Sequence, residues 1–204
     1  MKRFVAIVVA VMSFSTLASG QLKFGGGPHL SLAFSAFPKP VNEVYGFGFG
    51  FGAHGDMSII KYIALRLNFD YHIFSSDKEK IKAAAGVSQV QGLEISGLNA
   101  SIVGITINGL GKLPTGSMIT PYGILGLGIH ILSVSDGQAT IQGQNIPIQL
   151  GLGSETKFGL NFGAGAEFAI GMFKVYGDIK YVLILTSGNS TGIIPITFGV
   201  TFGG

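Results

Sequence analysis

The sequence predicts an all-β protein, a single eight-stranded antiparallel transmembrane β-barrel. Hydrophobic residues make up 47% of the 204 residues and charged residues only 11%, less than half the roughly 25% of a soluble domain. Beyond residue 20 no apolar run approaches the roughly 20 residues of a membrane helix, and only helices and closed barrels satisfy their backbone hydrogen bonds in lipid. The remaining chain alternates apolar with polar or small residues, and this period of two indicates β-strands.

The first twenty residues have the features of an export signal. The basic pair Lys2 and Arg3 precedes an apolar segment, and Ala18-Ser19-Gly20 is a small-residue cleavage site. The apolar segment is too short and too rich in serine to span a bilayer stably, although an uncleaved anchor helix is the alternative. We therefore expect a cleaved signal peptide over residues 1–20 and an outer-membrane β-barrel domain over residues 21–204.

Eight segments alternate clearly enough to predict a strand. In the clearest of them apolar residues recur at every second position from Ile63 to Ile73, and the residues between them include Arg66, Asn68, Asp70 and His72. We expect strands at about residues 23–35, 44–56, 61–73, 98–110, 119–133, 156–168, 172–185 and 192–202.

The less apolar face of these segments decides between a soluble fold and a membrane barrel. In a soluble sandwich that face meets water and carries many charges, whereas in a membrane barrel it fills the lumen. Here it is rich in glycine, as at Gly48, Gly50 and Gly52, and it carries few charges. Residues this small suit the inside of a narrow tube, so a soluble periplasmic barrel is only the residual alternative.

The connections between the segments alternate in length. They cover residues 36–43, 57–60, 74–97, 111–118, 134–155, 169–171 and 186–191. Outer-membrane barrels have short periplasmic turns and longer external loops. We therefore expect tight turns at 57–60 and 169–171 on the periplasmic side, and long surface loops at 74–97 and 134–155.

Four stretches carry a resemblance to a known family. They are PYGILGLG at residues 121–128, FGLNFGAGAEF at 158–168, VYGDIKY at 175–181 and IPITFGVTF at 194–202. In these Gly-rich strands the chain resembles the outer-membrane β-barrel proteins that include the small OmpA/OmpX-type barrels. The resemblance implies the cell outer membrane of a Gram-negative type of envelope, contact with outer-membrane lipid, and insertion by the barrel-assembly machinery.

Charged and polar residues on the inner face are the candidate site. Since an unpaired buried charge is costly, we expect them to form a lumen polar network that fills the barrel. An ion path through the lumen is the functional alternative, but about eight strands leave room only for side chains or one small ligand. The residues are Arg66, Asp70, His72, Glu167, Asp178 and Lys180.

Nothing in the sequence selects a catalytic or cofactor site. The histidines at 29, 54, 72 and 130 are expected on the inner faces of different strands, where a structural role is favoured over a metal site. No Ser/His spacing selects a triad, and the chain has no cysteine. The string GFGAHG at 50–55 matches a dinucleotide-binding motif by letters only, because no helix follows it. We expect no cofactor and no metal.

The function predicted from these features is a non-enzymatic, monomeric outer-membrane protein. Its barrel would anchor the loops 74–97 and 134–155, which would make any contacts with surface partners. Without Lys2 and Arg3 the chain has 11 basic and 10 acidic residues, so we expect no nucleic-acid partner. The alternatives are a narrow porin-like pore for ions or small solutes and, from a different class, a lipid-modifying enzyme.

Overall fold

The computed structural model describes residues 22–36, 44–84, 86, 92–141, 143–148, 153–186 and 191–203. The expected signal peptide, residues 1–20, lies outside the described residues. Among the residues described, no helix has the length and apolar character needed to cross a membrane.

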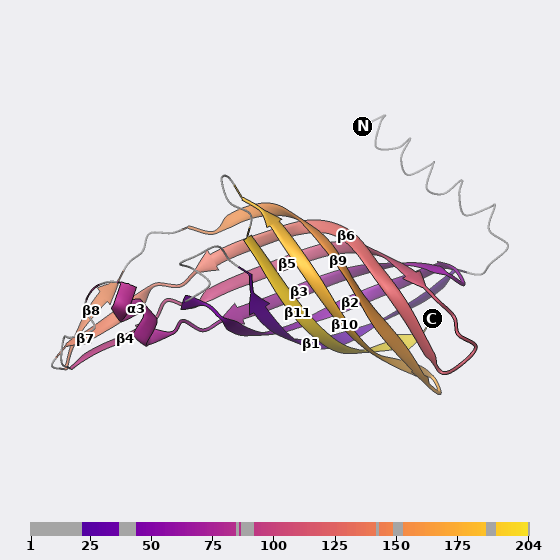
Figure 1. Ribbon diagram of the computed structural model, residues 1–204, viewed down its shortest axis with the longest axis horizontal. Helices are drawn as coiled ribbons and strands as arrows, with labels where there is room; N and C mark the ends of the chain where they lie inside the picture. Colours follow the sequence, from indigo (N-terminus) through magenta and orange to yellow (C-terminus); the bar gives the residue numbers. More distant parts are fainter. Residues whose placement is uncertain are drawn as a thin grey trace, which may run out of the picture.

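Eight antiparallel strands close into the predicted barrel (Figure 1). They are arranged around the barrel in the order β1-β11-β10-β9-β6-β5-β3-β2, and β1 pairs with β11 to close it. Each strand is longer than the roughly 9–11 residues that cross a bilayer at a tilt. Their bounds are Lys23–Ser35 (β1), Phe47–Ile60 (β2), Ile63–Phe74 (β3), Ala100–Lys112 (β5), Ile119–Val134 (β6), Glu155–Ile170 (β9), Phe173–Leu185 (β10) and Thr191–Gly203 (β11).

The predicted turn at residues 57–60 is wrong. Strand β2 continues to Ile60, and the turn to β3 consists of Lys61 and Tyr62. The register between β2 and β3 shifts between Ser58 and Ile60, so a bulge interrupts the alternation. This irregularity hides the end of the strand from an argument based on a period of two.

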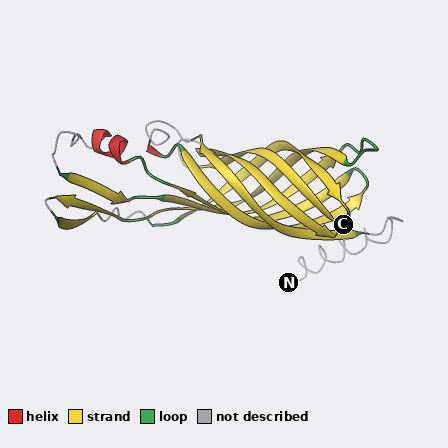
Figure 2. Cartoon of the chain, turned by 90° about the horizontal axis from the view of Figure 1, so that it is seen from below, coloured by secondary structure: helices red, strands yellow, loops and turns green. Residues whose placement is uncertain are grey.

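The two long connections, predicted as surface loops, contain regular secondary structure. They fold into a second sheet in the order β4-β7-β8, with β4 at Leu93–Gly97, β7 at Gly137–Ile141 and β8 at Gln144–Ile148. This sheet and helix α3, Lys78–Ala84, project beyond one end of the barrel (Figures 1 and 2). We call these four elements the extension, the end that bears them the loop end, and the opposite end the turn end.

The extension has an apolar core of its own. Leu93, Ile95 and Leu98 are buried, and Ile81 of α3 packs against them together with side chains of β7 and β8. Asp77 caps the helix, because its Oδ1 accepts hydrogen bonds from the main-chain nitrogens of Glu79 and Lys80 at 3.1 and 3.3 Å. The extension is therefore a folded body rather than a pair of independent loops.

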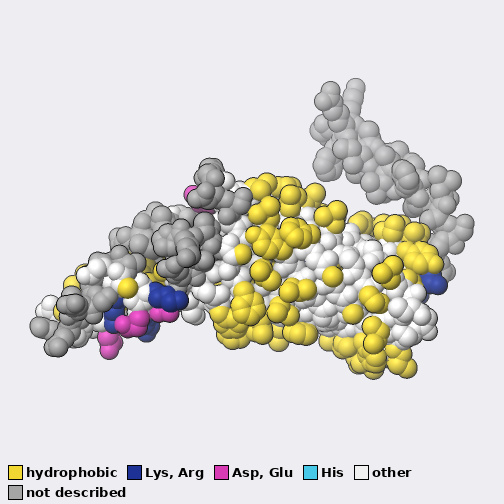
Figure 3. Space-filling view, viewed as in Figure 1, with side chains coloured by type: hydrophobic (Ala, Val, Ile, Leu, Met, Phe, Trp, Pro, Cys, Tyr) yellow, Lys and Arg dark blue, Asp and Glu magenta, His cyan; other side chains and the backbone are white. Residues whose placement is uncertain are grey.

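The outer wall of the barrel is apolar. Leu30 and Leu125 are 68% and 73% exposed there, and many other Phe, Leu and Ile side chains share this face. Figure 3 shows hydrophobic side chains spread over one side of the barrel, while the charged side chains in that view gather mainly over the extension. This distribution places the barrel in lipid and the extension in water.

Glycine on the inner wall makes room for large side chains that cross the lumen. A Cβ built on Gly199 would lie 2.5 Å from the ring of Tyr176, and one on Gly165 would lie 2.7 Å from the ring of Tyr122. The sequence interpretation that inner-face glycines suit a cramped tube is consistent with this packing.

We expect Gly199→Ala to destabilise the barrel, because its new methyl group would collide with the ring of Tyr176. Overpacking of this kind costs about 1–3 kcal/mol. The measurement is urea-induced unfolding of the protein in lipid vesicles, followed by circular dichroism. Gly123→Ala is the control, since a Cβ on Gly123 meets nothing within 4 Å. Equal losses in the two variants would contradict the packing argument.

Candidate functional site in the barrel lumen

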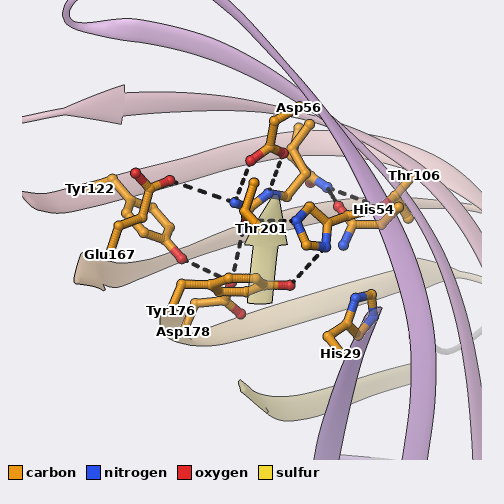
Figure 4. Close-up of polar contacts among 12 residues, drawn as sticks. His29, His54, Asp56, Thr106, Tyr122, Glu167, Tyr176, Asp178 and Thr201 are labelled. Atoms are coloured by element: carbon orange, nitrogen blue, oxygen red, sulfur yellow. Dashed lines mark hydrogen bonds and ion pairs between the residues drawn. The ribbon is translucent and has the colours of Figure 1, made fainter. Parts of the chain in front are cut away.

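Arg66 on β3 is the centre of an ionic cluster near the turn end. Figure 4 shows its acidic neighbours Asp56, Glu167 and Asp178. Its Nε and Nη2 donate hydrogen bonds to the two carboxylate oxygens of Asp56 at 2.7 and 2.8 Å. Glu167 and Asp178 approach the same guanidinium at 3.6 and 3.7 Å. The Arg66 side chain is only 3% exposed, so its charge is balanced by carboxylates rather than by bulk water.

Further groups surround the same guanidinium. Lys112 donates hydrogen bonds to both oxygens of Glu167 at 2.8 and 2.9 Å. The Arg66 guanidinium carbon lies 4.2 Å from the ring centroid of Tyr176, which suits a cation–π contact. Tyr122 donates a hydrogen bond to Asp178 at 3.2 Å. We call Asp56, Arg66, Lys112, Glu167 and Asp178 the Arg66 cluster.

A layer of histidines and amides lies next to this cluster along the barrel. His29 Nε2 lies 2.7 Å from Asp70 Oδ1, and His72 Nε2 lies 3.1 Å from the Ser31 hydroxyl. Asn161 donates to Asn108 at 3.1 Å, and Asn108 donates to Asn68 at 3.0 Å. These bonds connect side chains across the lumen, so the polar residues fill it rather than line an open channel.

The structure places all six predicted network residues on the buried inner face, at two levels. Arg66, Glu167 and Asp178 meet in the Arg66 cluster. Asp70, His72 and Lys180 instead line a cavity of about 10 Å³ in the middle of the lumen. A cavity of this size has room for about one water molecule.

The four histidines do not gather into a metal site. All four are buried inside the barrel, at 3–6% exposure. His29 and His54 lie 5.8 Å apart between ring centroids, while His54 hydrogen-bonds to Thr201 and Tyr176. Among the described residues, no group of three or more His, Cys, Asp or Glu side chains has an arrangement that suits a metal ion.

Sequence reasoning missed two members of the Arg66 cluster, Asp56 and Lys112. Asp56 directly opposes Arg66 in the β2–β3 register, so the alternation placed it on the inner face without naming its partner. Lys112 was assigned to a turn that was expected to begin at residue 111, whereas β5 continues through Lys112. A correct register would have identified Asp56, but the approach of Lys112 to Glu167 joins strands that are not neighbours.

An apolar layer closes the lumen at the loop end. It consists of Ala33, Phe74, Ala100, Ile102, Val182, Ile184 and Ile193, all buried. Tyr45, just before β2, packs against this layer and donates a hydrogen bond to the Leu98 carbonyl at 2.7 Å. Burial raises the pKa of the Tyr45 phenol above its ordinary value. The side chains that form this layer offer no polar group to a passing ion.

Comparisons with known proteins agree with the barrel. The family model described as the outer membrane protein beta-barrel domain matches residues 4–203. No curated protein matches the chain in sequence.

Two solved structures illustrate the similarity in fold. One is a major outer membrane protein from Thermus thermophilus, with a TM-score of 0.54 and 13% identity over 91% of this chain and 100% of that chain. The other is Neisserial surface protein A, with a TM-score of 0.52 and 14% identity over 90% of this chain and 97% of that chain. At identities this low, the similarity shows the fold alone.

We expect Arg66→Ala to lower the free energy of unfolding by about 3–5 kcal/mol, because it leaves buried carboxylates without their main cation. Arg66→Lys should lose less, since it keeps the charge but not the two-pronged bond to Asp56. Unfolding in urea measures both changes.

The control for this prediction is Lys82→Ala, which removes the surface ion pair between the partly buried Lys82 and the exposed Glu79 on α3. Such a pair contributes less than about 1 kcal/mol. A loss in Arg66→Ala no larger than the loss in Lys82→Ala would reject a structural role for the Arg66 cluster.

Proposed function

Because the chain belongs to the outer membrane protein beta-barrel domain family and so resides in the outer membrane, we propose that it is a non-enzymatic scaffold that displays its extension at the cell surface. Two features support this role. The lumen is filled with side chains, and the folded extension continues the barrel into water.

The apolar layer is the observation that carries the proposal. An ion that crosses the lumen must lose its hydration shell at this layer. Phe74, Ile102 and Ile184 offer no polar groups to replace that water. Below this layer, the Arg66 cluster joins β2, β3, β5, β9 and β10 through short ionic contacts. Both features favour a plugged scaffold over a narrow pore.

The inner polar residues also lack the access that an enzyme needs. Among the described residues, Ser31 and His72 form a Ser/His contact. The Ser31 hydroxyl lies 3.1 Å from His72 Nε2. They are 5% and 4% exposed, respectively, inside the barrel. A substrate would have to displace packed side chains to reach them. This contact therefore favours a structural role for the pair over the active site of a lipid-modifying enzyme.

The extension offers a polar sheet face to a partner. Leu93 and Ile95 of β4 contribute to the core beneath α3, so the alternating residues Glu94 and Ser96 point to the opposite face. The register places Gln138 and Thr140 of β7 beside them. A face of this composition suits a partner that binds through hydrogen bonds.

The extension sheet has two edge strands, β4 and β8, and the β8 edge is poorly suited to strand pairing. Pro147 lies within the edge strand β8 and has no main-chain N–H. A second strand that added to this edge would lack a donor at that position. At the β8 edge, this arrangement supports the expectation of a monomer.

We expect the mature chain to insert into planar bilayers without steady discrete conductance, because the apolar layer and the Arg66 cluster block the lumen. Single-channel recording measures this, and a heat-dependent gel shift of the same sample confirms insertion. Regular openings from correctly inserted protein would overturn the plugged scaffold in favour of the pore.

We expect the extension to lie outside the cell. The natural chain has no cysteine, so single cysteines report position without background. Gln144→Cys in β8 should react with a membrane-impermeant maleimide on intact cells. Met172→Cys, at a turn-end residue that is 93% exposed, should react only after the outer membrane is opened. The reverse pattern would invert the orientation and refute surface display.

A further inference from the structure

The extension is joined to the barrel by several chain connections (Figure 2). The structure describes three of them completely, at residues 75–77, 98–99 and 135–136. The last two belong to one ribbon, because the register of β4 with β7 has the same offset as that of β5 with β6. A two-stranded ribbon is by itself only marginally stable, so other contacts decide whether the extension keeps one orientation.

Leu98 lies at the point where this ribbon leaves the barrel. Its φ of 57° is in the left-handed region, which residues other than glycine rarely occupy. Its side chain is buried in the core of the extension, where a Cβ on Gly137 would lie 2.7 Å from Leu98 Cγ. Its main-chain nitrogen donates to the Asp136 carbonyl at 3.5 Å. A backbone conformation of this kind persists only where the surrounding contacts hold it.

Tyr45 supplies such a contact from the barrel. Its ring packs against the apolar layer that closes the lumen, and its hydroxyl donates a hydrogen bond to the Leu98 carbonyl at 2.7 Å. The preceding carbonyl, that of Val44, accepts a hydrogen bond at 2.9 Å from the main-chain nitrogen of Asp77, the residue that caps α3. Two adjacent residues therefore bind both the start of the helix and the ribbon.

Other hydrogen bonds join the connections to one another. The Ser76 hydroxyl donates to the Gly97 carbonyl at 2.9 Å, and the Ser76 nitrogen donates to Asn99 Oδ1 at 3.4 Å. The Asn99 nitrogen donates to the Ser135 hydroxyl at 3.0 Å, and the Ser135 nitrogen donates to the Asn99 carbonyl at 2.9 Å. The side-chain bonds among them are exposed to water, whereas the bond from Tyr45 is partly buried and is weakened less by solvent.

We propose that Tyr45 is a positioning residue that holds the extension in one orientation relative to the barrel. Its ring is anchored in the apolar layer and its hydroxyl binds the ribbon at Leu98. Tilting the extension must therefore break this hydrogen bond or pull the ring out of the layer.

A fixed orientation presents the polar sheet face of the extension on a rigid support. A pre-organised face binds its partner without the entropy loss of fixing that face on association. This use of the orientation rests on the proposed display at the cell surface, whereas the role of Tyr45 in positioning does not.

Distances between pairs of spin labels, measured by double electron–electron resonance in lipid vesicles, test the orientation. The chain has no cysteine, so Gln144→Cys in β8 and Leu185→Cys at the end of β10 provide a pair that joins the extension to the barrel. Leu185→Cys with Met172→Cys provides a control pair within the barrel. We expect one narrow distance distribution for each pair in the otherwise natural chain.

Tyr45→Phe removes the hydroxyl but keeps the ring. We expect the population of displaced orientations to rise about fivefold, the change that the loss of one hydrogen bond makes to an equilibrium. The distribution of the first pair should broaden, while the control pair and the temperature of the heat-dependent gel shift stay unchanged. Tyr62→Phe, at a residue that is 54% exposed at the turn end, is the matched control for loss of a tyrosine hydroxyl.

Two further variants separate the parts of the contact. Gly137→Ala should also broaden the first distribution, because its new methyl group displaces Leu98 while Tyr45 is intact. Tyr45→Ala should broaden it and, in addition, lower the temperature of the gel shift, because the ring is lost from the apolar layer.

The outcomes that would reject the proposal are distinct from those that would reject surface display. A broad or divided first distribution in the natural background would show that the extension has no fixed orientation. A distribution in Tyr45→Phe as narrow as the natural one, or equal broadening in Tyr62→Phe, would remove Tyr45 from this role. Because the distances do not depend on which side of the membrane the extension faces, an inverted cysteine-labelling pattern on cells would refute display alone.

Discussion

Closure of the hydrogen-bonded ladder is the constraint on which the rest of this molecule depends. In lipid, each main-chain N–H and C=O must find a partner within the protein, and an open sheet would leave two edges unsatisfied. The pairing of β1 with β11 removes those edges. Once the ladder closes, every second side chain must face the lumen, because strand side chains alternate between the two faces. The composition of both faces then follows from a single geometric requirement.

The narrow interior explains why the inner face mixes glycine with paired charges. Few large side chains fit, and each one needs a small neighbour, as Tyr176 does at Gly199. Charges can be tolerated there only when they compensate one another, and Arg66 meets three carboxylates while Lys112 binds one of them. The same contacts that satisfy buried charge also join strands that are not neighbours in the sheet. Filling and cross-linking of the lumen are thus two results of one arrangement.

The barrel was predictable because the alternation of apolar with polar or small residues repeats along each strand. From Ile63 to Ile73 apolar residues recur at every second position, so the inner position of Arg66 and Asp70 followed from the sequence. The extension gave no comparable signal. Its strands are five residues long, and their partners lie on the other long connection, as Leu93 pairs with Ile141. The contact of Lys112 with Glu167 was equally hidden, because it depends on how the barrel curves rather than on any local pattern.

Two neighbouring glycines differ in whether barrel packing explains their lack of a side chain. Gly199 and Gly177 lie on adjacent strands and would look alike in any count of composition. Gly199 has no free space on its inner side, so barrel packing explains its lack of a side chain. Gly177 has ordinary space on the lipid side, so packing does not explain it. The lipid-facing wall is therefore the part of this molecule where the fold constrains the size of a side chain least.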